Sequence, residues 1–165
     1  MTAHYEIRDI AAGDLPAVLR LNTEYEHFLS PLSLDELMAL RAQAQYARLV
    51  ELNSTVVAFL IAFTPRSGYG SVNYQWFDAH YDDYCYIDRI AIAEEAQGCG
   101  LGTALYDDLT AFSVASGLKK LACEYYCEPL NAGSAKFHSK YGFVEVGQQD
   151  VQGGSKRVSL QVRAL

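Results

Sequence analysis

The sequence predicts one α/β domain with a central mixed, mostly antiparallel sheet of about seven strands and helices on both faces. A length of 165 residues fits a single domain, which we expect to span residues 1–165. Half of the residues are apolar and 20% are charged, a balance typical of globular proteins with a buried core. Strand-like and helix-like patterns also succeed one another along the chain without an internal repeat.

Residues 5–44 predict one strand followed by two helices. Alternation of side chains over Tyr5–Asp9 indicates a short strand. Asp14 is a candidate N-cap for the first helix. Ser33 and Glu36 have the capping-box spacing and open the second helix, which should run to Ala44. The apolar side chains expected on the inner faces of these helices are Leu15, Val18, Leu19, Leu21, Leu34, Leu37 and Leu40.

Two strands and an unusual segment follow. The strands are expected over Ala47–Leu52 and Val56–Thr64, and the nearly continuous apolar character of the second indicates burial on both faces. Residues 65–83 contain glycine, proline and serine but also five aromatic side chains, so we expect a long loop. Such a loop is either a flap on the substrate side or a packed cover, and the sequence leaves both open.

The second half predicts the order strand, glycine turn, helix, strand, helix, strand, strand. Its long helix should turn Asp107 and Asp108 toward water. The core-facing positions of this helix are Leu105, Leu109, Phe112 and Ala115. The expected elements are a strand Tyr84–Ile92, a turn Gln97–Gly102, a helix from Leu101 to Gly117, a strand Lys120–Tyr126, a short helix Asn131–Tyr141, and paired strands Phe143–Gly147 and Val158–Val162 joined through Gly153-Gly154.

Composition excludes several classes of protein. A net charge of −7 argues against a nucleic acid as the main partner, since that binding depends on Lys and Arg. No apolar run approaches the roughly 18 residues of a membrane span. The stretch Met1–Glu6 has no basic segment leading into an apolar one, so we expect no secretory signal and a cytoplasmic protein. The four cysteines form no Cys-x-x-Cys pair, which favours free thiols over a metal site.

The charge is unevenly distributed along the chain. The first 117 residues hold six basic and sixteen acidic side chains, whereas all five lysines lie in the remainder. Such asymmetry suits a cationic ligand on one part and a phosphate on the other, and it also suits a random drift of surface charge.

The strongest local signal is Gln97-Gly98-Cys99-Gly100-Leu101-Gly102-Thr103, between a strand and a helix. Glycines let backbone N–H groups approach a ligand closely, and the first turn of a helix offers unpaired donors and the positive end of its dipole. The turn is therefore either a phosphate or pyrophosphate site or a plain helix cap. It is no P-loop, since no Gly-Lys-Ser/Thr follows, and Thr103 replaces the third glycine of a dinucleotide fingerprint, which disfavours a nicotinamide-dependent enzyme.

A second signal lies about 30 residues further on. Asn131, Ala135 and His138 are spaced so that one helical face presents an amide, a small residue and an imidazole. A histidine with an ordinary pKa of ~6.5 can give or take a proton near neutrality. Alone, such a histidine is also compatible with a structural or surface role.

Together, these signals give Tyr84–Gly147 a resemblance to the core of the GNAT superfamily of acetyl-CoA-dependent N-acetyltransferases. Its glycine motif, Gln/Arg-x-x-Gly-x-Gly/Ala, is matched by Gln97, Gly100 and Gly102. Its later motif is matched by Asn131, Ala135, Phe137-His138 and Gly142-Phe143. A bacterial branch of predicted acetyltransferases is more narrowly similar, through Tyr86-Ile87-Asp88-Arg89, Cys123-Glu124, Phe137-His138 and the segment Gly142–Gly147.

The resemblance implies a GNAT fold with one splayed pair of strands and acetyl-CoA as acyl donor. The strand around Ile90 and Ile92 would pair its backbone with the pantetheine arm, and a backbone N–H near Ile90 would polarise the thioester carbonyl. Asn131 would contact that arm or orient its neighbour, and Lys136 could lie near the 3′-phosphate. The backbone amides implied to hold the pyrophosphate are those of Gly98, Cys99, Gly100, Leu101, Gly102 and Thr103, after the motif residue Gln97.

Three residues are candidates for catalysis. His138 stands where the superfamily usually has the tyrosine that protonates the departing thiolate, and an imidazolium can do this with a different pH dependence. Asp88 and Glu124 are candidates for taking the proton of the attacking amine. Asp88 could instead form an ion pair with Arg89 or with a lysine, because a charge within an apolar sheet needs a partner. The face on which Glu124 lies stays open.

The sequence thus predicts transfer of an acetyl group from acetyl-CoA to a primary amine by direct attack in a ternary complex. The acceptor would be a small molecule or a peptide, with neither nucleic acid nor membrane as partner, and a homodimer is possible. The alternative is a catalytically degenerate module that binds CoA or acyl-CoA and regulates a partner. No metal ligand is expected.

Overall fold

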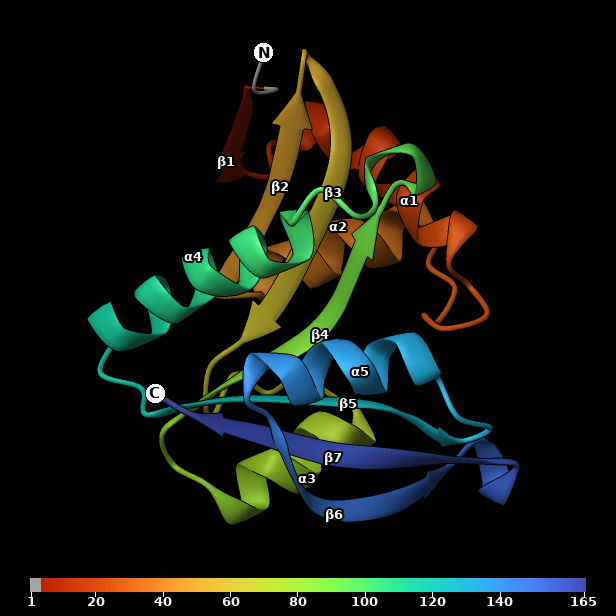
Figure 1. Ribbon diagram of the computed structural model, residues 1–165, viewed down its shortest axis with the longest axis vertical. Helices are drawn as coiled ribbons and strands as arrows, with labels where there is room; N and C mark the ends of the chain where they lie inside the picture. The colour runs from red at the N-terminus through yellow and green to blue at the C-terminus, as the bar shows by residue number, and fades with distance from the viewer. Residues whose placement is uncertain (1–3) are drawn as a thin grey trace. The chain divides into compact units, whose positions relative to one another are not determined.

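Seven strands form one mixed sheet in the order β1-β2-β3-β4-β5-β7-β6 in the computed structural model, which describes residues 4–165 (Figure 1). Residues 1–3, which belong to the stretch Met1–Glu6 expected to hold no secretory signal, lie outside the described residues. The strands are β1 (Tyr5–Asp9), β2 (Tyr46–Leu52), β3 (Thr55–Phe63), β4 (Tyr84–Ile92), β5 (Lys120–Glu128), β6 (Val144–Val151) and β7 (Lys156–Ala164). The helices are α1 (Leu15–Glu24), α2 (Leu34–Gln43), α3 (Val72–His80), α4 (Leu101–Ala115) and α5 (Ala132–Tyr141), with short 3-10 turns η1 (Ala12–Asp14), η2 (Glu94–Ala96) and η3 (Gln152–Gly154).

The predicted α/β fold with a seven-stranded mixed sheet is confirmed. β4 pairs with β5 in parallel, whereas β1–β2, β2–β3, β5–β7 and β6–β7 are antiparallel. None of the described helices is long and apolar enough to cross a membrane.

The chain divides into two compact units, and the boundaries between them fall within β4 and within α4. Unit 1 comprises Met1–Phe63 and Ile87–Leu109, and unit 2 comprises Thr64–Tyr86 and Thr110–Leu165. The parallel ladder of β4 with β5 belongs to unit 2 and joins Tyr84–Tyr86 to Lys120–Ala122. That residues 1–165 form a single domain remains a prediction.

In unit 1, helices lie on both faces of the strands β2 and β3. Figure 1 shows α4 in front of these strands and α2 behind them. Seven consecutive residues of β3, 57–63, are buried, so the predicted burial of this strand on both faces is confirmed. Asp14 stands at the N-cap of α1 as predicted, but its carboxylate accepts hydrogen bonds from Arg8 and from the backbone of Ala11 instead of capping the helix.

In unit 2, the strands β5, β7 and β6 lie between α5 and α3, in front and behind in Figure 1. The long loop predicted over residues 65–83 is wrong, because α3 forms within it. Ser71 caps this helix by accepting a hydrogen bond from the backbone N–H of Tyr74. Tyr74 and Phe77, three residues apart on one helical face, are fully buried. The helical part of this segment is therefore a packed cover, which is one of the two alternatives that the sequence left open.

The predicted faces of α4 need two corrections. Leu105 and Leu109 are buried as expected, but Ala115 is exposed and Phe112 is only half-buried. Asp108 is half-buried instead of fully turned to water, and its carboxylate accepts hydrogen bonds from Tyr46 Oη at 2.7 Å and from Arg48 Nη1 at 2.8 Å. An ion pair with β2 therefore occupies a helical position that periodicity alone assigns to solvent.

Candidate functional site

The segment Gln97–Thr103, called the glycine turn below, connects η2 to α4 in unit 1. Gly98 and Gly100 adopt φ values of +76° and +79°, a left-handed conformation that other residues adopt with strain. A Cβ added to either glycine meets no heavy atom of the described residues within 4 Å, so the space beside the backbone is open. The first N–H groups of a helix have no partner within the helix and lie at the positive end of its dipole. The turn therefore fits an anion such as a pyrophosphate.

The side chains of the glycine turn add no positive charge to this site. Cys99 is an exposed free thiol, and Leu101 is buried in the core. The side-chain amide of Gln97 donates to Tyr25 Oη and to the carbonyl of Ile92, the latter at 3.3 Å. An anion bound here would be held mainly by backbone N–H groups, since the preceding η2 contributes only the carboxylates Glu94 and Glu95.

The end of β4 presents alternating environments to its two faces. Asp88, Ile90 and Ile92 are of intermediate burial, whereas Arg89 and Ala91, which lie between them in the sequence, are buried. The carbonyl oxygen of Ile92 accepts from Tyr25 Oη at 2.5 Å as well as from Gln97. Two side-chain donors therefore already occupy the carbonyl that the resemblance assigns to a bound ligand.

Asp88 forms the ion pair that the sequence left as an alternative to catalysis. Its Oδ2 accepts from Arg89 Nε at 2.7 Å, and the two side chains are only 6% and 5% exposed. Arg89 Nη1 also donates to Asn22 Oδ1 at 2.8 Å, and Arg89 Nη2 donates to Ser30 Oγ at 3.0 Å. A carboxylate that neutralises a buried guanidinium has a structural function of its own.

Glu124 lies on β5 in unit 2, on the face covered by α3. Its Oε1 accepts from Tyr86 Oη at 2.9 Å and from Asn73 Nδ2 at 3.1 Å. Gln149 in turn donates to Asn73 Oδ1 at 3.0 Å, which fixes the orientation of the asparagine amide. Burial and, after it, the nearby Glu124 carboxylate raise the pKa of Tyr126 above its ordinary value. These contacts orient the Glu124 carboxylate through neutral donors.

His138 lies on α5 and is 5% exposed. Its Nδ1 donates to the carbonyl of Ser134 at 2.8 Å, and its ring stacks at 5.8 Å from that of Tyr125. Burial lowers the pKa of His138, and the bond to Ser134 opposes this only in part. The imidazole is therefore mostly neutral at pH 7, with Nδ1 protonated and the in-plane lone pair on Nε2. This shifts the acidic form expected from the sequence to lower pH.

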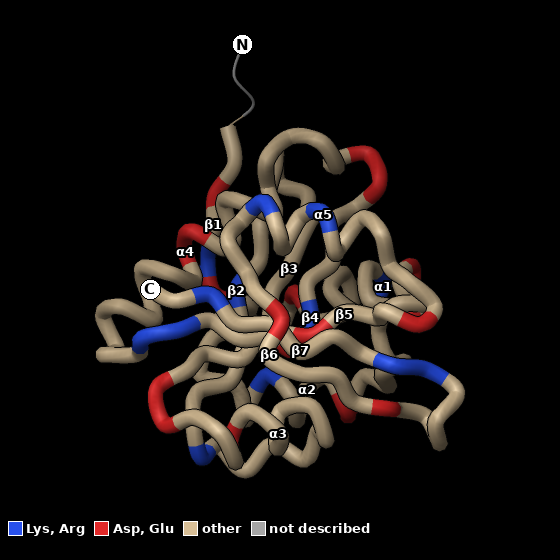
Figure 2. Tube along the Cα trace, turned by 60° about the horizontal axis from the view of Figure 1, so that its bottom comes forward, with Lys and Arg blue, Asp and Glu red and all other residues tan. Residues whose placement is uncertain are grey.

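Asn131 and Lys136 belong to the same segment as His138, at the N-cap of α5 and on the helix itself. Asn131 is the N-cap of α5, and its Oδ1 accepts from the backbone N–H of Ser134 at 3.2 Å. Lys136 is exposed, and Figure 2 shows basic but no acidic segments along α5. The capping signal was present in the sequence, since asparagine is among the preferred N-cap residues.

Sequence reasoning missed two residues of these networks. Tyr25, which ends α1, contacts residues 67 and 72 positions further along the chain. Asn73 lies within the segment wrongly expected to be a loop. No local motif marks either residue, because their partners come together only in the folded chain.

Comparison with protein families identifies the chain. The model of the acetyltransferase (GNAT) family matches residues 6–143, and the protein therefore belongs to this family of acetyltransferases. The family resemblance inferred from the glycine turn and α5 is thus confirmed, and acetyl transfer from an acyl-CoA is the general activity that it gives. A comparison with curated protein sequences finds no match.

Solved structures show the same fold at low identity. Ard1 from Thermoplasma volcanium is 16% identical with a TM-score of 0.78, covering 98% of this chain and 97% of its own. N-acetylglutamate synthase from Neisseria gonorrhoeae, in complex with coenzyme A and N-acetyl-glutamate, is 17% identical with a TM-score of 0.71, covering 100% and 36%. A chimera of the spermidine N-acetyltransferase SpeG from Vibrio cholerae and hSSAT is 21% identical with a TM-score of 0.71, covering 97% and 95%.

Proposed function

We propose that this protein transfers the acetyl group of acetyl-CoA to a primary amine by direct attack in a ternary complex. The observation that carries the proposal is the glycine turn, whose open, left-handed glycines lead directly into the N-terminus of α4. Acetyl-CoA would supply the activated acyl group and a pyrophosphate for this turn. In the reaction a nitrogen–carbon bond forms, the carbon–sulfur bond breaks, the amine loses a proton, and the departing sulfur gains one.

The donor would be held by backbone groups of unit 1. The N–H groups from Gly98 to Thr103 would bind the pyrophosphate, which suits a turn without basic side chains. The backbone at Ile90 and Ile92 would pair with the pantetheine arm, and the Ile90 N–H would polarise the thioester carbonyl. Because the Ile92 carbonyl already accepts from Tyr25 and Gln97, Ile90 would carry more of this pairing.

The proposal also assigns two residues of unit 2 to the donor, the N-cap of α5 and a lysine on that helix. Asn131 would contact the pantetheine arm or orient its neighbours, in addition to capping the helix. Lys136 would pair with the 3′-phosphate, in support of which α5 carries only basic charges (Figure 2).

The acceptor amine is mostly protonated at pH 7, so a group of the protein must take its proton. We assign this role to Glu124, whose carboxylate is oriented by Tyr86 and Asn73. Asp88 is the second candidate, since its ion pair with Arg89 already gives it a structural function. His138 would protonate the departing sulfur from its charged form, and the lowered pKa predicts that this contribution decreases as the pH rises.

The acceptor is proposed to be a small molecule or a peptide with a primary amine. Solved structures of this fold include proteins named for glutamate and spermidine as acceptors, so the fold accommodates chemically different amines. A cytoplasmic location and a homodimer belong to the same proposal.

Release of free thiol from acetyl-CoA across a panel of amines, amino acids, polyamines and peptides tests the proposal. Thiol release with at least one acceptor, together with acetylated product, is the expected result. Thermal stabilisation by coenzyme A without turnover on any acceptor would instead favour the regulatory module. Neither stabilisation nor turnover would overturn the assignment of the glycine turn.

A further inference from the structure

Side chains attach the end of α1 to the end of β4 and to the glycine turn. Tyr25, the C-cap residue of α1, donates from Oη to the carbonyl of Ile92 at 2.5 Å. Gln97 Nε2 donates both to Tyr25 Oη and to the same carbonyl. We call this triangle of Tyr25, Ile92 and Gln97 the Tyr25 clasp. All three residues lie in unit 1.

The Tyr25 clasp starts from a well-fixed backbone. The N–H of Tyr25 donates to the carbonyl of Asn22 at 3.1 Å, and its carbonyl accepts from Phe28 and Leu29 at 2.9 and 2.7 Å. A second attachment of the same segment to β4 comes from Arg89, which donates to Asn22 at 2.8 Å. The tyrosine hydroxyl is therefore presented to β4 from a segment held on both sides.

The hydroxyl remains a hydrogen-bond donor under ordinary assay conditions. Burial first, and then the nearby carboxylates of Glu24, Glu94 and Glu95, raise the pKa of Tyr25 above its ordinary value, while the Gln97 amide opposes the shift. Ionisation of Tyr25 would also leave the carbonyl of Ile92 facing an anion. The clasp should therefore be unchanged between pH 6 and pH 9.

Gln97 is the first residue of the glycine turn and precedes Gly98, which has a left-handed conformation. A turn rich in glycine has many conformations in the free protein, and ordering it on binding costs entropy. Fixing the side chain at its first residue reduces that cost before any ligand binds.

We infer that Tyr25 is a positioning residue, which acts through Gln97 to hold the glycine turn in its donor-binding conformation without touching the donor. This inference rests on the proposed function, because it concerns the same turn. It gives the end of α1 a part in donor affinity.

A double-mutant cycle on coenzyme A binding tests this inference. Dissociation constants are measured by isothermal titration calorimetry for the wild type, Tyr25→Phe, Gln97→Leu and the double variant. Tyr25→Phe removes only the hydroxyl and should weaken binding about five- to tenfold, the effect of one hydrogen bond. The double variant should bind no more than about twofold more weakly than Gln97→Leu, since both substitutions break the same clasp.

A matched control separates this effect from general loss of stability. Tyr5→Phe removes the hydroxyl of an exposed tyrosine on β1 of the same unit and should bind coenzyme A like the wild type. In spectra without ligand, Tyr25→Phe should move the backbone amide resonances of Gly98 and Gly100, whereas Tyr5→Phe should not.

The outcomes distinguish this inference from the proposed function. Wild-type protein that fails to bind coenzyme A contradicts the proposed function itself. Wild-type binding with an unchanged affinity of Tyr25→Phe overturns the clasp alone. Additive effects of Tyr25→Phe and Gln97→Leu also overturn it, because they show that the two side chains act independently.

Discussion

The two carboxylates that the sequence offered as proton acceptors have opposite surroundings. Asp88 in unit 1 pairs at 2.7 Å with the guanidinium of Arg89, which is itself buried. Glu124 in unit 2 accepts from the neutral groups of Tyr86 and Asn73. The pair of Asp88 with Arg89 is a buried charge pair, whereas the hydroxyl of Tyr86 and the amide of Asn73 hold the Glu124 carboxylate in a fixed orientation.

This difference shows that two residues of the same chemical type can have different partners in one fold. Both acidic residues lie on strands, Asp88 on β4 and Glu124 on β5. In the proposed function, Asp88 is mainly structural and Glu124 accepts the proton. The predictions below test this separation, first in stability and then in activity.

The largest effect is expected from breaking the ion pair of Asp88. Arg89→Met should lower the free energy of unfolding by about 3–5 kcal/mol, because it leaves a buried carboxylate without its guanidinium. Urea denaturation measures this change. Arg157→Met, which removes a 40% exposed arginine paired with Asp150, is the control and should cost less than about 1 kcal/mol. Equal losses of unfolding free energy in the two variants would contradict a structural function of the Asp88–Arg89 ion pair.

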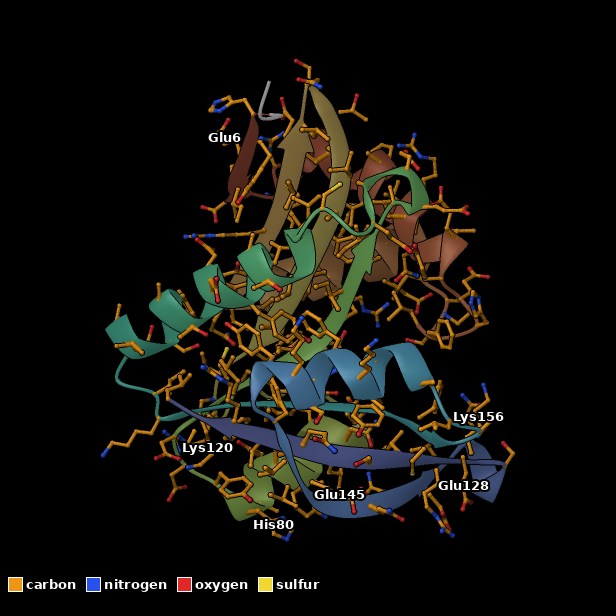
Figure 3. All side chains as sticks on the ribbon, viewed as in Figure 1. Glu6, His80, Lys120, Glu128, Glu145 and Lys156 are labelled. Carbon is orange, nitrogen blue, oxygen red and sulfur yellow. The ribbon has the colours of Figure 1, made fainter. Side chains whose placement is uncertain are left out.

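Glu124→Gln should lower kcat by about 100-fold or more, because proton transfer by a positioned side chain contributes at least this factor. The loss should decrease at high pH, where more of the amine is already deprotonated. Rates of thiol release between pH 7 and pH 10 measure both effects. Glu128→Gln, at the end of the same strand (Figure 3), is the control and should keep the wild-type rate. A wild-type pH profile for Glu124→Gln would transfer the role to another group.

Gly100→Val tests the backbone site of unit 1. A β-branched residue at φ +79° is strained by about 1–3 kcal/mol, so the turn should change conformation and coenzyme A should bind about 10- to 100-fold more weakly. Calorimetric titration with coenzyme A measures this loss. Gly13→Ala, a glycine of unit 1 where a Cβ meets nothing within 4 Å, is the control. Undiminished binding to Gly100→Val would mean that the phosphates lie elsewhere.

The smallest effect is expected from titration of His138. Its folded-state pKa is lowered by burial, so the unfolded chain binds the proton more tightly. The resulting stability is present above the unfolded pKa of ~6.5 and is lost as the pH falls through the lower folded value. His138→Gln should therefore reduce the decrease of Tm between pH 7.5 and pH 5. An undiminished decrease would show that His138 does not cause it. For catalysis, an unchanged rate of His138→Ala from pH 6 to pH 9 would remove His138 as the acid.

The parts of the structure that the sequence could predict are those set by local rules. The glycine turn was predictable because left-handed backbone and close approach both require glycine, at Gly98 and Gly100. β3 was predictable because a strand with a long run of apolar residues is stable only where other parts of the chain cover both of its faces. The helix α3 was missed because Ser71, its N-cap, lies among glycine and serine residues that also mark loops.

The remaining features depend on contacts between distant residues. Glu124 meets Asn73 and Tyr86 across 51 and 38 positions, and Tyr25 meets Gln97 across 72. No pattern within one segment contains such pairs. The ion pair of Asp88 with the adjacent Arg89 could be named as an alternative from the sequence, but its presence and burial are seen only in the folded chain.

The most direct test of the account follows backbone amide resonances of the isotope-labelled protein during titration with coenzyme A. If the glycine turn binds the pyrophosphate, we expect saturable chemical-shift changes of the amides of Gly98, Cys99 and Gly100, with little change at Gly13 and Gly153. Binding of coenzyme A that leaves the glycine-turn amides unmoved would contradict it.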